Sequence, residues 1–313
     1  MKKILRLGSR GSPLALLQAE EVRNKILQAH PTWAVDGEIE IVPIRTTGDW
    51  RPEHKERSLM DMGGDKGLFT KEIDEALQAN FIDMAVHSMK DVPTLLPDDL
   101  EFVAVLDRLD PRDAFLGRHV RTLDELPSGA VVGTSSLRRQ AQILARRPDL
   151  VVKPLRGNID TRIRKLNSGD ADATLLAVAG MMRLGVTDRI SSTLDTDVML
   201  PSAAQGALGV EIRRDNEAIR SMLSAINMPQ VATCIQAERA LLRVLDGSCH
   251  TPIGALAEIQ TDGTLKIDGL VAKPDGTAVI RLEHAGSIKD AENVGKELGA
   301  KLKKKMPANF FAA

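Results

Sequence analysis

The sequence predicts an α/β protein made of two similarly built α/β domains followed by a small α+β domain. Its 313 residues exceed what one average domain needs, so two or three domains are expected. Up to about residue 226, short apolar strands alternate with helical segments, which favours parallel or mixed sheets. The remainder combines helices with strands joined by a tight turn, as in an α+β domain.

The first α/β region begins with a strand that leads directly into a helix. Ser12 is expected to cap this helix, and Pro13 to occupy its first position, where a missing backbone N–H costs nothing. Apolar runs and helical periodicity predict the other elements of the region. The predicted strands are Ile4–Gly8, Glu38–Ile44 and Asp83–His87, and the second predicted helix is Leu68–Leu77.

A second region has the same design. A strand at Ala130–Gly133 is expected to run into a helix that is capped within Thr134–Ser136 and ends near Arg147. Leu150–Leu155 is the next predicted strand. In both regions a strand that ends in Gly-Ser or Gly-Thr enters a helix beside an arginine, so we expect two domains of similar construction.

Two crossings between these regions define the expected domain boundaries. Asp107–Arg112 is the predicted first crossing and Met199–Gln205 the return, after which Ala207–Ile212 continues as a strand of the first domain. Domain 1 is therefore expected to contain residues 1–106 and 206–226, domain 2 residues 107–205, and domain 3 residues 227–313.

The third domain is expected to have helices at both of its ends. Helical periodicity covers Val231–Leu245 and Ala291–Lys305. Between them, Leu265–Val271 and Thr277–Leu282 are predicted strands separated by the turn Pro274-Asp275-Gly276.

Composition excludes several classes of protein. A net charge of -1 and 3% aromatic residues argue against a nucleic-acid binder, which is usually basic and offers stacking rings. The two cysteines are too few for the disulfide framework of a secreted domain. No apolar run has the length of a signal peptide core or of a membrane span. We therefore expect a cytosolic protein, although a mature organelle protein would look the same.

Arginines and hydroxyl residues gather where strands are expected to meet helices. Helix N-termini attract anions, and arginine can bind a carboxylate through two parallel hydrogen bonds. A single arginine of this kind is usually solvated surface charge, but three such junctions in one chain favour a ligand with several negative charges. The junction residues are Arg10 and Ser12, then Thr134, Ser136, Arg138 and Arg139, and finally Arg156 and Arg162.

Lys90 and Asp91 follow directly after a predicted strand, where open α/β sheets bind their ligands. The pair is either a structural ion pair or a carboxylate that stabilises a cation or exchanges a proton, and spacing alone does not decide between them. His87 is expected to be a hydrogen-bonded strand residue. No metal site is expected, because the six histidines are scattered and no cysteine–histidine group has ligand spacing.

The two cysteines are expected to differ. Cys249 follows Gly247 and Ser248 in a predicted loop, so its thiol is expected to be accessible and is either incidental, a nucleophile or an attachment point. Cys234 lies within a helical run and is expected to be buried. The glycine-rich residues 63–67 match neither a Walker loop nor a dinucleotide fingerprint, and predict a mobile loop that carries Lys66.

Over almost its whole length, the chain resembles the porphobilinogen deaminase family. The matching segments have the family's order and approximate spacing, which makes the resemblance highly specific. They are Arg10–Leu16, Lys66–Glu72, His87–Pro93, Asp110–Phe115, Gly133–Arg139, Leu155–Asn158, Leu176–Gly180, Gln205–Ala207 and Gly247–Cys249. One departure is Asp65, an extra acidic residue ahead of Lys66.

The resemblance implies a fold, a reaction and a cofactor. The first two domains would be built like bilobal solute-binding proteins, and the third would carry the cofactor. The implied activity is that of a transferase, a hydroxymethylbilane synthase, that condenses four porphobilinogen molecules with loss of ammonia into the linear tetrapyrrole hydroxymethylbilane, in tetrapyrrole (haem or chlorophyll) biosynthesis. The implied cofactor is a dipyrromethane joined to Cys249 through a thioether.

The resemblance also implies roles for individual residues, with Asp91 as the catalytic carboxylate. The cofactor would be held by Cys249, Ser88, Lys90, Thr134, Ser136, Arg138, Arg139, Arg156 and Arg183. The substrate would be held by Arg10, Ser12, Gln18, Lys66, Phe69, Arg156, Arg162 and Gln205. The expected partner is porphobilinogen, with no nucleic acid or membrane, and the chain is expected to be a cytoplasmic monomer, or a plastid stromal one if it is a mature organelle form.

Two other classes remain as alternatives at this point. A non-enzymatic bilobal protein that binds small anions would use the first two domains, but not the Cys249 loop. A transcriptional effector-binding module would need a helix-turn-helix segment, for which the sequence offers no candidate. Both alternatives rest on analogy of fold alone.

Overall fold

The structure is a computed structural model that describes residues 3–48, 67–247, 251–307 and 310–311. It forms two compact units. The first contains the described residues up to 109 together with residues 206–232, and the second contains residues 110–205 and the described residues from 233 onward. Within the described part, no helix combines the length and the apolar character needed to cross a bilayer.

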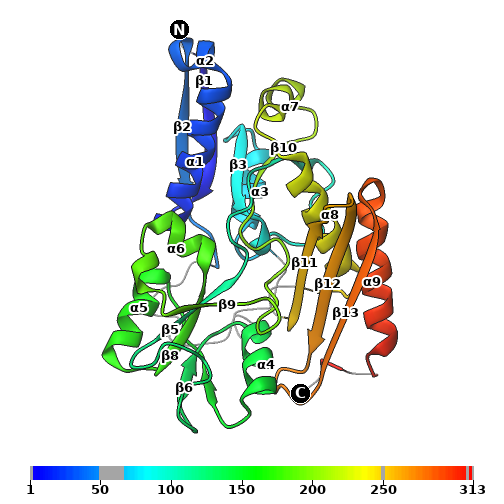
Figure 1. Cartoon of the computed structure of the whole chain (residues 1–313). Helices are drawn as coiled ribbons and strands as arrows, with labels where there is room; N and C mark the ends of the chain where they lie inside the picture. Colours follow the sequence, from blue (N-terminus) through cyan, green and yellow to red (C-terminus); the bar gives the residue numbers. More distant parts are fainter. Residues whose placement is uncertain (1–2, 49–66, 248–250, 308–309, 312–313) are drawn as a thin grey trace. The chain divides into compact units, whose positions relative to one another are not determined.

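A mixed sheet forms the centre of the first unit (Figure 1). Its strands are β1 (Lys3–Arg10), β2 (Gly37–Ile44), β3 (Met84–Ser88), β4 (Leu100–Val105) and β10 (Leu208–Arg213). They lie in the order β2-β1-β3-β10-β4, with β1 parallel to β2 and β3, and with β10 antiparallel to β3 and β4. The helices are α1 (Pro13–Ala29), α2 (Pro31–Asp36), α3 (Lys71–Gln78) and α7 (Glu217–Ser224).

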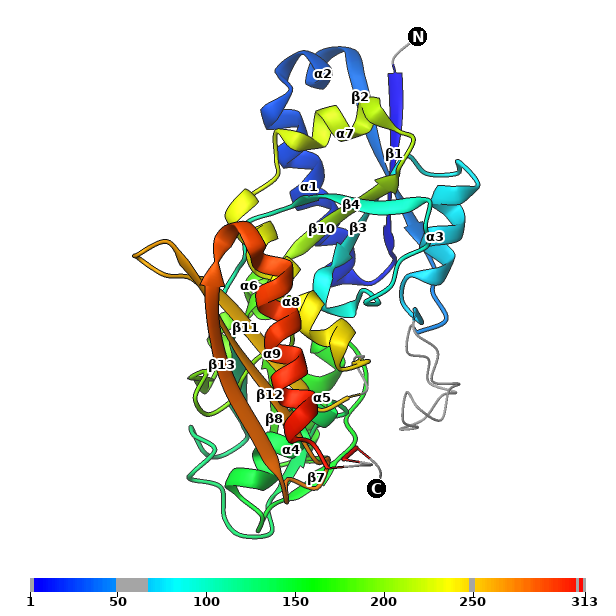
Figure 2. The ribbon, with the colours of Figure 1, turned by 90° about the vertical axis from the view of Figure 1, so that its right-hand side faces the viewer.

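Helices cover both faces of this sheet. Because side chains alternate along a strand, Val86 of β3 faces one side and packs in a core with Val22 of α1 and Leu223 of α7. Its neighbour Ala85 faces the other side and packs with Ile73 of α3. In Figure 2, α1 and α3 accordingly lie on opposite sides of the strands. This arrangement leaves the ends of the strands as the places where polar side chains can gather.

The second unit contains a sheet of the same design. Its strands are β5 (Asp113–Gly117), β6 (Val131–Gly133), β7 (Val151–Lys153), β8 (Ala173–Ala177) and β9 (Ser192–Leu194). They lie in the order β7-β6-β8-β5-β9, with β6 parallel to β7 and β8, and with β5 antiparallel to β8 and β9. In each sheet, one antiparallel strand is therefore inserted between three parallel strands and a fourth strand of the same direction. The prediction of two similarly built α/β regions is confirmed.

Helices also cover both faces of this second sheet. They are α4 (Leu137–Arg146), α5 (Ile159–Ser168) and α6 (Val178–Leu184). Ile143 of α4 packs in one core with Phe115 and Leu175, whereas Leu166 of α5 and Met181 of α6 share the other core.

The C-terminal part of the second unit has a separate antiparallel sheet. Its strands β11 (Ile253–Ile259), β12 (Thr264–Ala272) and β13 (Val279–Ser287) pair in that order, and α8 (Pro229–Val244) and α9 (Ala291–Lys305) accompany them. Leu241 of α8 and Leu298 of α9 pack on one face of the sheet, and Leu270 of the other face packs against Ala141 of α4.

Most of the predicted boundaries are confirmed to within a few residues. Ser12 caps α1, and its Oγ accepts a hydrogen bond from Ala15 N at 3.3 Å. The helix predicted from Leu68 begins later, at Lys71. The reason is Gly67, whose φ of 109° is left-handed and whose carbonyl instead closes a turn onto Thr70 N and Lys71 N. The proposed division into three domains is untested, since the last sheet and the second α/β region form one unit.

Candidate active site

In each unit, the predicted site residues follow the carboxyl ends of parallel strands. Ser12 follows β1, and Lys90 and Asp91 follow β3. In the second unit, Ser136 follows β6 and Arg156 follows β7. This edge of an open α/β sheet is where ligands bind, because helix N-termini and strand ends leave backbone N–H groups unpaired there.

Asp91 lies in a short 3₁₀ turn, Met89–Asp91, that continues directly from β3. Met89 is buried and its N–H donates to the carbonyl of Ala207 at 3.1 Å, which fixes the turn against the start of β10. Lys90 and Asp91 themselves are half-buried. The turn thus has an anchored backbone and presents its carboxylate and its ammonium group at the surface of the unit.

Gln18 connects this turn to α1. Its Nε2 donates a hydrogen bond to the Ser88 hydroxyl at 3.0 Å. Gln18 is only 5% exposed although its side chain ends in a polar amide. Arg10, at the end of β1, lies over the ring of Phe69, with the guanidinium carbon 4.3 Å from the ring centre. The structure therefore brings together, within the first unit, two pairs of residues that the sequence assigned to the site.

The helix α4 begins at the second junction. Ser136 caps it by accepting a hydrogen bond from Arg139 N at 3.4 Å, and the Thr134 hydroxyl accepts one from Ser136 N at 3.2 Å. In these two hydrogen bonds the hydroxyl oxygens are acceptors, and the bonds fix the start of α4. The Oγ of Ser135 is buried and has no hydrogen-bond partner in the part of the chain that the structure describes. The helix start thus retains an unused polar group, as an anion-binding helix terminus would.

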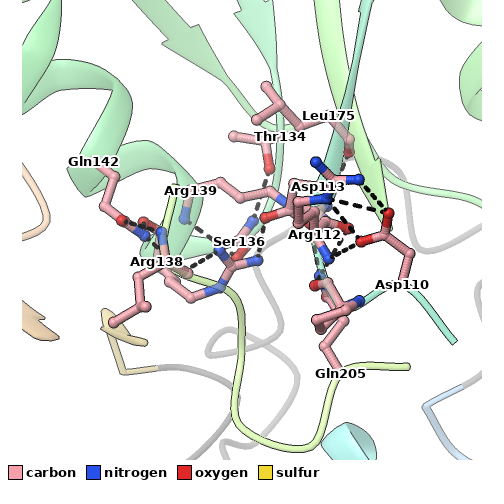
Figure 3. A network of polar contacts seen from close by, with 12 residues as sticks. Asp110, Arg112, Asp113, Thr134, Ser136, Arg138, Arg139, Gln142, Leu175 and Gln205 are labelled. Carbon is pink, nitrogen blue, oxygen red and sulfur yellow. Dashed lines mark hydrogen bonds and ion pairs between the residues drawn. The ribbon is translucent and has the colours of Figure 1, made fainter. Parts of the chain in front are cut away.

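Arg138 and Arg139 are buried in a network around Asp113, which Figure 3 shows. Arg139 donates a hydrogen bond to one oxygen of the Asp113 carboxylate, and Arg138 forms an ion pair with the other, both at 2.7 Å. Arg138 also donates to the carbonyl of Leu200, and Arg139 to that of Leu175, each at 2.8 Å. Both arginines therefore have internal partners, and their predicted contacts with a ligand remain predictions.

The charge of Asp113 depends on these arginines. Burial by itself would raise the pKa of its carboxyl, but the positive charges of Arg138 and Arg139 outweigh burial and hold this pKa below its ordinary value. Burial lowers the pKa of Arg138, with Asp113 acting in the opposite direction. One carboxylate against two guanidinium groups leaves a net positive charge in the network. Arg139 Nε is buried without a hydrogen-bond partner among the described residues, so the network has the charge and a donor for an anionic group.

The other arginines and Gln205 occupy different surroundings. Gln205 is 1% exposed, and its Nε2 donates to Asp113 at 2.9 Å and to the carbonyl of Pro111 at 2.7 Å. Arg156 is buried, and Arg162 is half-buried with its Nε donating to the carbonyl of Gly157 at 2.9 Å. Arg183 is half-buried in the last turn of α6. The structure thus joins Gln205 to the Asp113 network.

Two predicted site residues, Cys249 and Lys66, lie outside the described residues. Around Cys249, α8 ends at Val244 and β11 begins at Ile253. Cys234 is buried at 9% exposure in the core of α8, α9 and the C-terminal sheet, as predicted.

Sequence reasoning assigned no role to Asp113. Its strand β5 was not predicted, although an aspartate directly before the apolar run Ala114-Phe115-Leu116 was the available signal. The sequence does not indicate that this aspartate is buried, because its two partner arginines lie on α4, far along the chain. A charge is tolerated in such a place only when it is paired.

Comparisons with known proteins show which family the chain resembles. Residues 5–221 match the family model described as "Porphobilinogen deaminase, dipyromethane cofactor binding domain", and residues 232–304 match "Porphobilinogen deaminase, C-terminal domain". The chain is 48% identical over 305 residues to a porphobilinogen deaminase of Nitrobacter winogradskyi, covering 97% of this chain and 94% of the relative. It is 48% identical over 311 residues to a chloroplastic one of Pisum sativum, covering 98% and 83%.

Similarity to solved structures is more distant. One match is the methionine-binding protein MetQ, with a TM-score of 0.44 and 15% identity over 73% of this chain and 92% of that chain.

Proposed function

This chain belongs to the porphobilinogen deaminase family, transferases that build hydroxymethylbilane on a dipyrromethane cofactor, and we propose that Cys249 carries this cofactor and that Asp91 is the catalytic carboxylate. The proposed reaction joins four porphobilinogen molecules. In each step the aminomethyl carbon of one molecule loses ammonia and bonds to a free pyrrole carbon of the growing chain, which then loses a proton. The observation that supports the proposal most directly is the match of both parts of the chain to the family, at residues 5–221 and 232–304.

Asp91 is proposed to stabilise positive charge. Loss of ammonia leaves a cation spread over the pyrrole ring and its nitrogen, and a carboxylate facing that nitrogen lowers the energy of the cation. The anchored turn Met89–Asp91 supports this role, because a fixed carboxylate need not reorganise as the charge develops. We propose that this carboxylate also accepts the proton lost after C–C bond formation.

The basic and hydroxyl residues are proposed to bind carboxylates. When bound, the dipyrromethane supplies the free pyrrole carbon to which the first unit is added. Each ring bears two carboxylates, so six linked rings bring about twelve negative charges that require paired cations. We propose this role for Arg10, Ser12, Ser88, Lys90, Thr134, Ser136, Arg138, Arg139, Arg156, Arg162, Arg183 and Lys66. Gln18, Phe69 and Gln205 are proposed to shape the site around them.

The net positive charge of the Asp113 network supports this assignment. Arg138 and Arg139 together carry one more charge than Asp113 neutralises. A network that holds its arginines in place before the ligand arrives loses little side-chain entropy on binding. The ligand carboxylate then compensates the remaining charge.

Cys249 is proposed as the attachment point because the other cysteine is unsuitable. Cys234 is buried within a packed core, where a bulky adduct has no room. Cys249 follows a glycine and a serine in the segment between α8 and β11.

The assignment is tested by supplying porphobilinogen to the purified protein and measuring ammonia and linear tetrapyrrole. The Cys249→Ser variant is expected to lose nearly all activity, because a hydroxyl is a far poorer nucleophile than a thiolate. Cys234→Ala is the matched control and is expected to remain active, with a change in stability only. Full activity of the serine variant would refute Cys249 as the attachment point, and no tetrapyrrole from the parent protein would refute the activity itself.

We further propose a monomer with three domains, as divided from the sequence, that acts in the cytoplasm or the plastid stroma. The relatives in bacteria and in a chloroplast support both locations. Light scattering on the purified protein tests the oligomeric state, with 34.0 kDa as the expected mass of the chain.

A further inference from the structure

Three ionisable side chains to which no site role is assigned meet inside the first unit. Asp74 is on α3, His87 on β3 and Glu211 on β10. A nitrogen or oxygen atom of each lies within 4.8 Å of such an atom of the other two. His87 Nε2 and Glu211 Oε2 are 3.0 Å apart, and these two side chains are 4% and 1% exposed.

The sheet register explains why these residues meet. Glu211 lies directly opposite Ala85 in the antiparallel pair of β10 and β3, so both point to the same face. His87 is two residues after Ala85 and points to that face as well. This is the face on which Ile73 of α3 packs, and Asp74 is the next residue along that helix.

The cluster is enclosed and unevenly charged. Phe102 of β4, which brings no ionisable group, contacts the His87 ring edge-on with 5.6 Å between ring centres. Asp74 Oδ1, His87 Nε2 and Glu211 Oε1 are buried without hydrogen-bond partners in the described part of the chain, so the 3.0 Å approach of His87 to Glu211 is a close contact and not an aligned hydrogen bond. Two carboxylates face one imidazole, and a buried charge is costly unless it is compensated. At least one carboxyl group therefore has reason to hold a proton.

We propose that Asp74, His87 and Glu211 form a buried proton-sharing cluster that fixes the ends of β3 and α3, and so positions Asp91 and Phe69. The cluster adjoins site segments on both elements. Asp91 follows His87 by four residues in the turn after β3, and Phe69 lies two residues before α3 begins. All three residues act through others, and none touches the reacting atoms in this proposal.

The protonation of Asp74 supports the sharing of a proton. Burial, and next the charge of Glu211, raises the pKa of the Asp74 carboxyl to about 7, against the opposing charge of His87. Glu72, on the same helix, is the other ionisable group that acts on it, and it also raises this pKa. A proton on Asp74 removes one of the two negative charges that the buried carboxyl groups would otherwise carry.

The first experiment measures kcat and KM for porphobilinogen in the holoenzyme of three variants. His87→Leu is expected to lower kcat about tenfold or more with KM nearly unchanged, because a small displacement of a catalytic group is costly. Adding Glu211→Gln in the same chain is expected to restore part of kcat and of the melting temperature, since it removes the charge that lost its partner. Val210→Ala, equally buried on the other face of β10, is the control and is expected to lower only the melting temperature.

A double variant that is worse than His87→Leu would overturn the proposal, because simple loss of packing accumulates and does not reverse. A His87→Leu protein with the parent's kcat would overturn it too. This inference rests on the proposed function for its activity readout. If the parent itself makes no tetrapyrrole, the proposed function fails, whereas the stability readout described next still tests the cluster.

The second experiment needs no activity and no destabilising change. The folded-state pKa of Asp74 is raised from 3.8 to about 7. The stabilising effect of its protonated form on the folded protein is therefore lost as the pH rises through this range. Asp74→Asn cannot ionise, so its melting temperature is expected to exceed the parent's at pH 8 by several degrees and to approach it at pH 4, close to the ordinary pKa of 3.8.

Equal differences at both pH values would contradict the sharing of a proton. Metal analysis of the purified parent gives an independent check. One bound transition-metal ion per chain that is lost in Asp74→Asn would show that the cluster is a metal site, and would overturn the proposal.

Discussion

The surroundings of Asp91 allow its proposed catalytic role to be separated from a structural one. It is half-buried in a turn whose backbone is fixed by the neighbouring Met89, so its side chain contributes little to the core. Asp91→Asn keeps the size of the side chain but removes the charge that would face the pyrrole cation. We expect kcat to fall about 100-fold or more with an unchanged melting temperature, measured by tetrapyrrole formation and calorimetry.

Asp91→Glu is the matched variant for this position. It keeps the negative charge but displaces it by one methylene, so we expect more residual activity than in the Asn variant. An Asn variant as active as the parent would remove Asp91 from the mechanism. Parallel losses of activity and melting temperature would instead identify a structural ion pair with Lys90 or another cation.

Substitution of Asp113, unlike that of Asp91, is expected to lower the stability of the protein. It is fully buried between Arg138 and Arg139, and Asp113→Asn leaves both guanidinium groups without their carboxylate. Breaking a buried ion pair from one side typically costs about 3–5 kcal/mol. We therefore expect a large decrease in the free energy of unfolding, measured by denaturant titration at pH 7.

The pH dependence of Asp113 has a definite sign. Its folded-state pKa lies below the ordinary value of 3.8, so its stabilising effect is complete above about pH 4 and is lost as the pH falls further. Parent and Asp113→Asn should therefore converge in stability on acidification. A constant difference between them from pH 7 to pH 3 would show that the carboxylate charge is not what stabilises the network.

At the scale of elements, the turn between β12 and β13 packs on α4. Gly276, with a φ of 75°, would place a Cβ 2.4 Å from the backbone nitrogen of Ala145, and Gln140 Nε2 donates to the carbonyl of Pro274 at 3.1 Å. Gly276→Ala is therefore expected to push the turn away from α4 and to lower the melting temperature by much more than the left-handed conformation alone would.

Gly263 provides the control for this prediction. It has a similar φ of 80° in the turn between β11 and β12, but a Cβ there would meet nothing within 4 Å. Gly263→Ala should cost only the conformational penalty, about 1 kcal/mol. Equal effects of the two substitutions would mean that the β12–β13 turn does not depend on its contact with α4.

Elements with strong local signals were predictable from the sequence. The Ser12-Pro13 pair specified the start of α1, and the apolar run before Ser88 specified β3, because caps and alternation depend on neighbours in the chain. β5 and β8 were not predicted. Their residues are buried on both faces and show no alternation, so a short apolar run was the only local signal.

The candidate site was predictable only in part, for a related reason. The residues that touch a ligand lie in short motifs after strands, and the motifs carry the family resemblance. Of the residues that hold them in place, His87 and Asp113 lie in such motifs, but Asp74 and Glu211 lie outside them. Asp74, His87 and Glu211 are separated by up to 137 positions and meet only because β10 returns from the second region to pair with β3. Topology, not local sequence, creates that cluster and the Asp113 network.

At the scale of the whole molecule, the chain has a net charge of -1 while its predicted ligand is highly anionic. Each unit has its own polar residues after strand ends, and Cys249 falls between α8 and β11 in the sequence. The charge of the protein therefore has to be arranged locally, as it is around Asp113. We infer that the cofactor attached to Cys249 is the first anionic group that these local cations bind.

The most direct test of this conclusion is the intact mass of the purified protein, followed by mass analysis of its proteolytic peptides. We predict a mass above that of the bare 34.0 kDa chain by one dipyrromethane, with all of the excess on the peptide that contains Cys249 and none on the one that contains Cys234. An active protein with the bare mass, or with the excess on a different residue, would contradict the assignment of the cofactor to Cys249.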